Sequence, residues 1–487
     1  MQQSLITGMG IWSCIGTSCA QVTEALRIGR PGIGIVPERT AYGYQSPLSG
    51  IVPAPDLKNE PLRNAQRRTL SEPSAYGYMA VKQALAQSGL TDLSRVALIV
   101  SNDSTAEAMA DTEALMALHH DTRRLGGFQV FRSLNSTVSM SLASIFGIGG
   151  LSLSVSAACA GGGHAIGIAH SLIQSGIIDC AIIVGTQEVG IHAYTSFDAL
   201  GVFSQRTDDP SAASRPFDSL RDGLVPSGGA ACIILESPQH LAARTHPRPV
   251  SSPAMASPSS DPSSAPSPSP IPLAAVIGYG FSTSPNIVTP SPESILAAMQ
   301  MALGCPYEHV AAHLSTIFPH ATSTRDGDMA EAKAITALLA SIPDHPLPLP
   351  MAFGLPVTSH TTPTAPSASA ADAHASAASP ASASPAAAPA AASSRHPRIV
   401  PTKALTGHEC WMSGVSQVVY AVLQQQGHFV APHPNLRHPD PAACFDIPTT
   451  PQSYDHTLYL CNAFGFGGTN ASLLLAAPSL LPLSHPE

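Results

Sequence analysis

The chain has 487 residues, of which 44% are hydrophobic and only 11% are charged, and its formal net charge is −9. This length suits two or three domains or one large duplicated fold. The acidic balance excludes the basic footprint of nucleic-acid-binding proteins, so no nucleic acid is expected as a partner.

The chain begins with MQQSLITGMGIWSCIG, which predicts a strand and a turn. This segment has no basic region of the kind that opens a signal peptide, so no signal peptide is expected. The longest apolar runs are far short of a membrane span. Nine cysteines occur without a CxxC pair, which indicates neither a disulfide framework nor a zinc site, and no metal is expected. We therefore expect a protein of the reducing cytoplasm without a membrane partner.

Apolar runs and helical patterns alternate through the first half of the chain. Ser71 is expected to cap a helix and Gly89 to end it, since a side-chain acceptor at the start and a glycine at the end are typical helix limits. Strands are predicted at 3–9, 95–103, 151–158, 180–189 and 228–237, and helices at 19–29, 71–89, from about 105, and at 159–176.

The second half repeats this order. The two halves of the chain end alike, in GGAACIILES (228–237) and GGTNASLLLAA (467–477), and this likeness favours an internal duplication. One strand remains open, because LPVTS (355–359) and RIVPTK (398–403) both match the strand that leads into the segment around Lys403. Other strands are predicted at 272–283 and 455–465, and helices at 292–304, 330–341 and 413–427.

Two segments differ from the rest in composition. Residues 246–271 and 360–396 consist mostly of Ser, Pro, Ala and Thr, and they offer too little apolar surface to offset the entropy of ordering. We interpret both as disordered low-complexity loops. They divide the chain into an N-terminal half at 1–245 and a C-terminal half at 272–359 and 397–479. The alternation of strands and helices predicts an α/β fold with a mixed or parallel sheet between helix layers.

Three separated segments end in residues suited to thiol or proton chemistry. Cys159 follows a predicted strand and opens a glycine-rich helix, where free amide groups favour a thiolate and lower the pKa of the thiol. The alternative is an inert buried cysteine. His320 follows the apolar run HLSTIF and His408 precedes a helix, and each alone is better explained as a partly buried structural histidine. Together with Cys159 they indicate one site assembled by folding.

Six motifs resemble, in their order along the chain, those of β-ketoacyl-acyl carrier protein synthases, which are elongating condensing enzymes of the thiolase fold. They are ITGMG, SVSAACAGGGHAIG, SRPFDSLRDGLVPSGGAACIILE, HATSTRDGDMAEAKAI, TKALTGH and NAFGFGGTN. The resemblance covers almost all residues outside the two low-complexity segments. It implies a duplicated α-β-α-β-α layered fold with two mixed five-stranded sheets. The implied reaction is the decarboxylative condensation of malonyl-acyl carrier protein with a cysteine-bound acyl chain in fatty-acid elongation.

The resemblance implies a role for each matching residue. The nucleophile falls on Cys159, and the two histidines that hold the extender unit fall on His320 and His408. The family's structural lysine matches Lys403, and the glutamate that pairs with it matches Glu331. This pair is implied to order the loop of His320, and an ordinary ion pair is the alternative.

Further matches concern the substrate channel. Thr322 and Thr324 match the threonines that hold the pantetheine arm. Phe466 matches a gating phenylalanine whose backbone amide completes the oxyanion hole, and Phe464 is its neighbour in the gate. The resemblance implies no cofactor bound by the enzyme itself, because the acyl carrier protein supplies the phosphopantetheine.

The resemblance also implies partners. The family is dimeric through the strand before the nucleophile, so we expect a homodimer with FRSLNSTVSMSLASIFG (131–147) near its interface. Carrier proteins are acidic, and a net acidic enzyme needs a local basic patch to bind one. The docking candidates are Arg63, Arg67, Arg68, Arg123 and Arg124, for which solvated surface arginines are the alternative.

Two departures from the family pattern bear on the substrate. HATST replaces the commoner HGTST, and GHECWMSG replaces a run of smaller residues after His408, which places Trp411 near the site. Two alternatives to fatty-acid elongation remain open. One is a ketosynthase of a polyketide or aryl-polyene pathway, and the other is a non-catalytic partner subunit, against which the presence of the cysteine and both histidines argues.

Overall fold

The computed structural model describes residues 3–245, 271–287, 289–346 and 396–481. Most of both low-complexity segments falls outside the described residues, so their expected disorder remains a prediction. The candidate strand at 355–359 also falls outside them. Within the described ranges, no helix is both long enough and apolar enough to cross a membrane.

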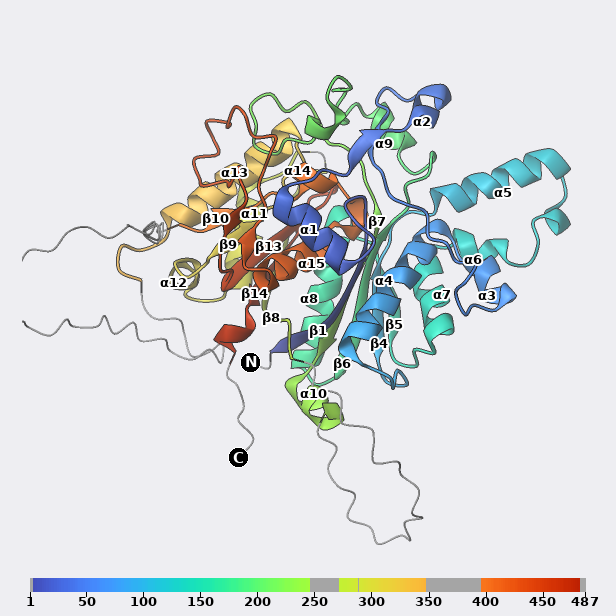
Figure 1. The fold of residues 1–487 in the computed structure, drawn as a ribbon, viewed down its shortest axis with the longest axis horizontal. Coiled ribbons are helices and arrows are strands. Elements are labelled where there is room, and N and C mark those ends of the chain that lie inside the picture. Colours follow the sequence, from blue (N-terminus) through green and yellow to red (C-terminus); the bar gives the residue numbers. More distant parts are fainter. Residues whose placement is uncertain (1–2, 246–270, 288, 347–395, 482–487) are drawn as a thin grey trace, which may run out of the picture.

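Ten strands form one continuous mixed sheet (Figure 1). Their bounds are β1 (Ser4–Trp12), β4 (Ala97–Ser101), β5 (Ser152–Val155), β6 (Cys180–Gln187), β7 (Gly229–Glu236), β8 (Ala274–Thr283), β9 (Thr316–Phe318), β10 (Arg398–Ile399), β13 (Leu458–Phe464) and β14 (Thr469–Ala476). They lie side by side in the order β10-β9-β13-β14-β8-β1-β7-β6-β4-β5. Two small pairs complete the strands, β2 (Ile33–Ile35) with β3 (Leu48–Gly50) and β11 (Phe429–Val430) with β12 (Gln452–Ser453).

The strand pattern is repeated in the two halves of the sheet. β5, β4 and β6 run parallel, and β7 and β1 follow antiparallel. In the same way β10, β9 and β13 run parallel, and β14 and β8 follow antiparallel. β7 and β14, which follow the two Gly-Gly pairs, therefore occupy equivalent positions, in agreement with the predicted duplication.

The expectation of two separate five-stranded sheets needs correction, because the two halves are joined. The first three residues of β1 pair antiparallel with Ala274–Val276 of β8, while most of β1 pairs with β7. A strand has two hydrogen-bonding edges. β1 offers one edge to β7 and, at its N-terminal end, the other edge to β8, so each half contributes five consecutive strands to one sheet.

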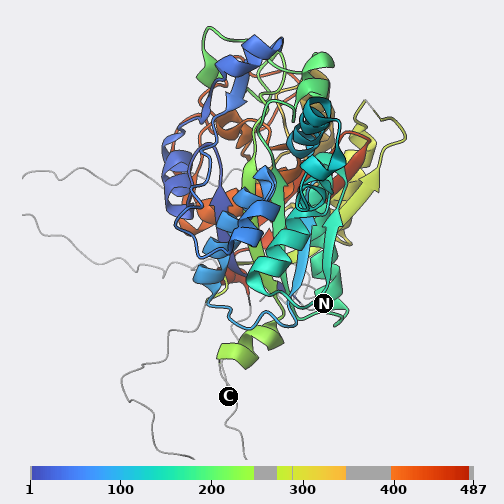
Figure 2. The ribbon, with the colours of Figure 1, turned by 90° about the vertical axis from the view of Figure 1, so that its right-hand side faces the viewer.

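Helices cover the sheet in layers (Figures 1 and 2). α8 (Gly161–Gln174) and α15 (Ser413–Gln426) pack against strands of both halves and form the central layer. α4 (Glu72–Ser88) and α7 (Thr137–Phe146) cover the other face of the N-terminal half. α11 (Pro292–Leu303) and α13 (Arg325–Ala340) cover the other face of the C-terminal half. The expected succession of α and β layers is thus present around one sheet.

Alternate residues of the strands separate these layers. In β6, Ala181 and Ile183 belong to the central core, whereas Ile182 and Val184 belong to the core under α4. Successive side chains of a strand point to opposite faces, so a strand buried on both sides is apolar throughout. All eight residues of β6 are buried, which explains its continuous apolar run.

Helix limits follow local sequence signals. The Ser71 hydroxyl accepts a hydrogen bond from the Ser74 amide at the start of α4, and Gly89 ends this helix with φ 65°. Both predicted limits are confirmed. The remaining helices are α1 (Cys19–Ile28), α2 (Pro37–Tyr42), α3 (Asn64–Thr69), α5 (Ala106–His119), α6 (Gln129–Ser133), α9 (Thr195–Ala199), α10 (Pro238–Thr245), α12 (Tyr307–Ala311) and α14 (Lys403–Thr406).

Candidate active site

One cavity of about 430 Å³ lies where segments from both halves meet. Cys159 follows β5, His320 follows β9, His408 follows β10 and α14, and Phe464 ends β13. All four residues line this cavity. The fold therefore assembles the three predicted segments at one place, with the nucleophile from the N-terminal half and both histidines from the C-terminal half.

Cys159 lies on a tight 3₁₀ turn (Ala158–Ala160) between β5 and α8. Ala158 has φ 46°, which is a strained value for a residue with a side chain. The carboxylate of Asp103 supports the turn, since it accepts hydrogen bonds from the Ala158 amide at 2.8 Å and from the Ser156 hydroxyl. Asp103 was not predicted from the sequence, although its place at the end of the strand at 95–103 is a signal that could have indicated it.

The glycines after Cys159 allow backbones to approach closely. A Cβ on Gly162 would lie 2.8 Å from the Val415 amide nitrogen, and one on Gly163 would lie 2.8 Å from the Ala471 side chain. The glycine run therefore packs α8 against α15 and β14.

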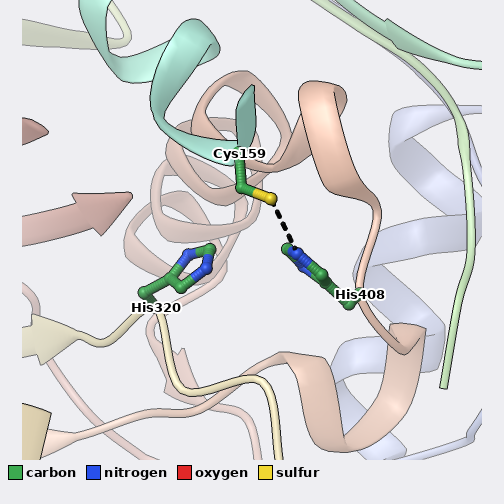
Figure 3. A group of neighbouring side chains, drawn as sticks. All are labelled: Cys159, His320 and His408. Carbon is green, nitrogen blue, oxygen red and sulfur yellow. Dashed lines mark hydrogen bonds between the residues drawn. The ribbon is translucent and has the colours of Figure 1, made fainter. Parts of the chain in front are cut away.

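The three reactive side chains contact one another in the cavity (Figure 3). The Cys159 Sγ lies 3.1 Å from His408 Nε2, the only hydrogen bond drawn between them in Figure 3. The rings of His320 and His408 are nearly perpendicular, at 87°, with centroids 5.1 Å apart. Cys159 and His408 are each 2% exposed and His320 is 9% exposed, so the site is largely removed from water.

Burial sets the protonation states of the site. It lowers the pKa of His320 and His408 well below the ordinary histidine range, and the nearby Lys403 charge lowers both further. Both imidazoles are therefore neutral at physiological pH, so each carries one N–H donor.

The thiol behaves differently from the sequence-based expectation. Burial raises the pKa of Cys159 to about 12, which outweighs the lowering by Lys403 and by the backbone amides of Phe466 and Cys159 itself. The helix start therefore does not leave a free thiolate in the resting enzyme. His408, whose Nε2 contacts the sulfur, is placed to take the proton as the sulfur reacts.

His408 is held from both sides. Its amide donates to the Val225 carbonyl at 2.7 Å, and its carbonyl accepts from the Ser227 amide at 2.9 Å. Its Nδ1 lies 3.3 Å from the Ser413 hydroxyl. By contrast, the buried Nδ1 of His320 has no hydrogen-bond partner among the described residues. Of the two histidines, His320 thus has a ring nitrogen, Nδ1, that remains available for a hydrogen bond in the cavity.

Glu331 holds the loop of His320 directly. Its carboxylate accepts from the His320 amide at 2.9 Å and the Ala321 amide at 2.7 Å, and from Asn462 Nδ2 at 3.0 Å. The alanine of HATST is therefore accommodated in the turn. Asp328, one helical turn earlier on α13, accepts from the Ser323 amide at 3.0 Å, where φ is 73°.

The implied pairing of Lys403 with Glu331 is not a direct contact. Within the described ranges, no ion pair of 4.0 Å or less joins them, and Lys403 Nζ donates to Gln417 Oε1 at 3.2 Å. Burial lowers the pKa of Lys403 to about 8, while the charges of Glu331 and Glu409 oppose this shift. Lys403 is thus a buried cation balanced by carboxylates at longer range.

Glu409 is a buried carboxylate that the sequence reasoning missed. Its oxygens accept from the Tyr420 hydroxyl at 2.6 Å and the Ser416 hydroxyl at 2.5 Å, and it is 2% exposed. Burial raises the pKa of Glu409 to about 7. The position of Glu409 directly after His408 could have indicated it, because a carboxylate next to a buried histidine of a motif is itself expected to be buried.

The remaining channel residues also line the cavity. Thr322 and Thr324 lie with their hydroxyl oxygens 3.1 Å apart. The Phe464 ring is 5.8 Å from that of His320, between centroids. Phe466 is 36% exposed, so it lies where the cavity meets solvent. These positions are compatible with the predicted roles, which remain predictions.

The five candidate docking arginines lie in two segments that meet. The Arg68 guanidinium lies over the ring of Phe128 at 4.6 Å, which joins α3 to the segment after Arg123 and Arg124. Arg67 donates to the carbonyl of Glu60 at 2.6 Å and so holds its own loop. Arg123 forms an ion pair with Asp121 at 2.9 Å. Arg63 and Arg124 are exposed.

Among the residues that the structure describes, two groups of side chains have the composition of a metal site. Ligand atoms of Cys159, His320 and His408 lie within 4.8 Å of one another, and so do those of Cys180, Glu236 and His240. In the second group Arg244 binds both carboxylate oxygens of Glu236, at 2.6 and 2.7 Å, which leaves them unsuited to a cation. The first group is the reactive site itself.

The chain is similar in sequence to known proteins. Residues 3–240 match the family model described as Beta-ketoacyl synthase, N-terminal domain. The chain is 28% identical to the 3-oxoacyl-[acyl-carrier-protein] synthase 1 of Haemophilus influenzae, over 97% of this chain and 98% of that one. It is 29% identical to the enzyme of the same name from Escherichia coli (strain K12), over 98% of this chain and 99% of that one.

Solved structures share the fold. A beta-ketoacyl synthase from Burkholderia phymatum STM815 superposes with a TM-score of 0.76 at 23% identity, and it covers 98% of this chain and 100% of that one. The ishigamide ketosynthase/chain length factor superposes with a TM-score of 0.74 at 22% identity, over 98% of this chain and 99% of that one. The family model, the full-length relatives and the fold agree: residues 3–240 belong to the β-ketoacyl synthase family, and the likeness to named 3-oxoacyl-[acyl-carrier-protein] synthases runs over almost the whole chain.

Proposed function

We propose that this chain is a β-ketoacyl-acyl carrier protein synthase that condenses malonyl-acyl carrier protein with an acyl chain on Cys159 in fatty-acid elongation. The observation that carries the proposal is the 3.1 Å contact of Cys159 Sγ with His408 Nε2, beside a second buried histidine with an unpaired Nδ1. Full-length relatives named 3-oxoacyl-[acyl-carrier-protein] synthase support the substrate class.

The first step is acyl transfer to the enzyme. As the Cys159 sulfur attacks the carbonyl carbon of the acyl thioester, its proton moves to His408 Nε2. The oxyanion that forms accepts hydrogen bonds from the amides of Cys159 and Phe466. When the intermediate collapses, the carbon–sulfur bond to phosphopantetheine breaks, and the departing thiolate takes the proton back from His408. The acyl group is now a thioester of Cys159.

The second step uses the extender. The neutral imidazole of His320 donates a hydrogen bond to the thioester carbonyl oxygen of the malonyl group, and so does that of His408 in the tautomer that carries its proton on Nε2. The bond to its terminal carboxylate breaks, CO₂ leaves, and the electron pair remains as an enolate. The enolate carbon attacks the acyl carbon on Cys159, the Cys159 thiolate leaves, and it takes up a proton from water, which restores the resting thiol. The product is a β-ketoacyl thioester two carbons longer.

The enzyme itself binds no cofactor in this proposal, because the carrier protein brings the phosphopantetheine arm. The hydroxyls of Thr322 and Thr324, 3.1 Å apart in the cavity lining, are placed to hydrogen bond its amides. A solved structure of a type II PKS acyl-carrier protein in complex with its ketosynthase has the same fold, with a TM-score of 0.72 at 20% identity. We place the reaction in the cytoplasm, where carrier-bound intermediates of this kind are soluble.

We also propose a homodimer. β5 is the last strand of the sheet and pairs only with β4 among the described strands, so one of its edges is open. Open edges of this kind are pairing sites. α7, which contains most of the segment 131–147, packs beside β5, and α6 packs against α7.

Variants of the two reactive residues test the proposal. The purified enzyme is incubated with an acyl-carrier protein and malonyl-carrier protein, and products and protein are followed by mass spectrometry. Cys159→Ala should abolish the acyl-enzyme and the β-ketoacyl product. His320→Ala should keep the acyl-enzyme but lower condensation by about 10²–10³-fold, since it removes a donor used only in the second step.

Other outcomes are informative. Unchanged condensation in Cys159→Ala would exclude the proposed role of Cys159, whereas a wild-type chain that forms neither acyl-enzyme nor product by itself would favour a non-catalytic subunit. Loss of acylation in His320→Ala would contradict its assignment to the second step. Release of polyketide chains that keep their β-keto groups, rather than single elongation products, would favour a polyketide or aryl-polyene pathway.

A further inference from the structure

The cavity beside Cys159 reaches solvent near Phe466, which lines it and is 36% exposed. Cys159 also belongs to an apolar cluster, and of its buried members only Cys159 and Leu224 line the cavity. Tyr194, Phe203, Cys410 and Trp411 belong to the cluster without lining the cavity. The cluster therefore stands directly behind the part of the cavity wall that Cys159 and Leu224 form.

Trp411 is the largest side chain of the cluster and is 8% exposed. The ring of Phe197 lies against it, with centroids 6.1 Å apart, and against Phe466, with centroids 5.8 Å apart. Three aromatic rings thus form a continuous row from the buried cluster to the cavity lining.

The backbone of Trp411 is fixed relative to the nucleophile. The Ser101 hydroxyl donates to the Trp411 carbonyl at 2.8 Å. The same hydroxyl packs against Gly161, two residues after Cys159, where a Cβ would lie only 2.5 Å from it. The backbone of Trp411 is therefore held by packed secondary structure beside the turn that carries Cys159, and both side chains belong to the same buried cluster.

Packing alone does not explain a tryptophan here. The buried Nε1 of Trp411 has no hydrogen-bond partner among the described residues. An unpaired buried donor lowers stability, so a phenylalanine would fill an apolar position of similar shape at lower cost. The additional bulk of the indole is the property that remains to be explained.

We propose that Trp411, backed by Phe197, limits the acyl group on Cys159 to a short and compact chain. Trp411 is then a specificity-determining residue of the condensation. The inference rests on the proposed function, since it concerns the acyl group that the first step places on Cys159. A longer chain would have to displace the ring row or remain in the open part of the cavity, where the extender unit must bind.

The test compares acylation of Cys159 by a ladder of acyl pantetheine thioesters, from acetyl through butyryl and hexanoyl to decanoyl. Rates are measured by intact-protein mass spectrometry. Wild-type enzyme should be acylated fastest by the acetyl and butyryl thioesters, and the rate should fall beyond them. Trp411→Ala should shift the maximum to longer chains, because each methylene that gains an apolar site is worth about fourfold in rate. Decanoyl should therefore gain tenfold or more relative to acetyl.

Two further variants complete the series. Trp411→Phe removes the unpaired N–H and part of the bulk but keeps a ring, so its preferred chain length should lie between those of the wild type and Trp411→Ala. Trp12→Phe changes the other of the two tryptophans, whose Nε1 donates to the Pro53 carbonyl away from the cavity, and should leave the ladder unchanged. Two results would overturn the inference and leave the proposed function intact. One is that the wild type is acylated at equal rates by all the thioesters, and the other is that Trp411→Ala keeps the chain-length preference of the wild type. Failure of every thioester to acylate Cys159 would overturn the proposed function as well.

A second measurement needs no cavity-forming variant. In the Trp12→Phe protein, Trp411 is the sole tryptophan, so intrinsic fluorescence reports on its surroundings alone. Acylation by butyryl or hexanoyl thioester should change the emission maximum or intensity, with an effect that depends on chain length. Emission that is the same for every acyl group would show that the chain does not reach Trp411 and would overturn the inference.

Discussion

Buried charged side chains lie near His320 and His408, the two histidines of the candidate site. Lys403, Glu331 and Glu409 are each at most 3% exposed, and none forms an ion pair of 4.0 Å or less with another within the described ranges. Charges buried without a direct partner are costly, so each perturbs the protonation of the others. The His408 loop is therefore a place where small changes of charge alter both stability and reactivity.

The Glu409→Gln variant should change how stability depends on pH. The folded-state pKa of Glu409 is raised from 4.5 to about 7, so the folded enzyme holds this proton more tightly than the unfolded chain. The resulting stability is complete below pH 4.5 and is lost as the pH rises through 7. Glutamine has no such proton. The unfolding free energy of the wild type relative to Glu409→Gln should therefore fall by up to about 3 kcal/mol between pH 5 and pH 8.

Denaturant unfolding at both pH values measures this difference. The exposed Glu113, changed to glutamine, is the matched control, and it should show no comparable trend. A constant difference between wild type and Glu409→Gln across this range would contradict the assignment of a bound proton to Glu409.

The residues that sequence motifs could indicate are those whose chemistry is local. Cys159, His320 and His408 were recognisable because each stands in a distinct motif, and the fold places them together. Asp103 and Glu409 were missed because their importance depends on what they contact. The raised thiol pKa of Cys159 was also beyond local reasoning, since it depends on burial by residues from the whole chain.

At the scale of elements, strand patterns and helix limits were the most predictable features. Continuous apolar runs gave β4, β6 and β7, and glycine or serine signals gave the ends of α4. The joining of the two halves through β1 was not predictable, because no sequence pattern states which edge of a strand is free. The choice between the two stretches before Lys403 was settled only in part: β10 forms at Arg398–Ile399, and 355–359 lies outside the described residues.

The open edge of β5 predicts where a partner copy pairs. The Leu98 amide donates to the Leu151 carbonyl at 2.7 Å, and the parallel register then directs the amide of Ser152 away from β4. Ser152→Pro removes that outward donor, so we expect the proposed dimer to weaken by tenfold or more in its dissociation constant. Ser152→Ala keeps the donor and is the control.

Light scattering coupled to size exclusion over a range of protein concentrations measures this effect. A dimer of unchanged strength in Ser152→Pro would place the interface elsewhere. A monomeric wild type would contradict the proposed homodimer itself.

At the scale of the whole molecule, the enzyme is acidic, with a net charge of −9, and must attract a carrier protein of the same sign. Exposed arginines grouped on one region can do this locally. Arg63→Glu or Arg124→Glu should raise the KM for carrier-bound substrate by about tenfold, with little effect on a pantetheine thioester. Arg67 is less suitable for this test than its neighbours, because it holds the Glu60 loop.

The exposed Arg95, before β4, is the matched control, since Arg95→Glu makes the same change in net charge. Steady-state kinetics at two salt concentrations would separate docking arginines from ordinary surface arginines, because salt screens the attraction between docking charges and the carrier protein. Equal effects of Arg63→Glu on both substrates, or an equal effect of Arg95→Glu, would contradict a docking role.

The position of β1 has a consequence for how the chain is made. β1 leaves the ribosome early, but its partner strands begin only at Gly229 and Ala274. At bacterial synthesis rates this apolar strand waits on the order of ten seconds for them. The N-terminal half therefore completes its sheet late, and a fragment that stops at residue 245 would keep the β8-facing edge of β1 open. We expect such a fragment to aggregate during synthesis, whereas the whole chain, expressed in parallel, stays in the supernatant.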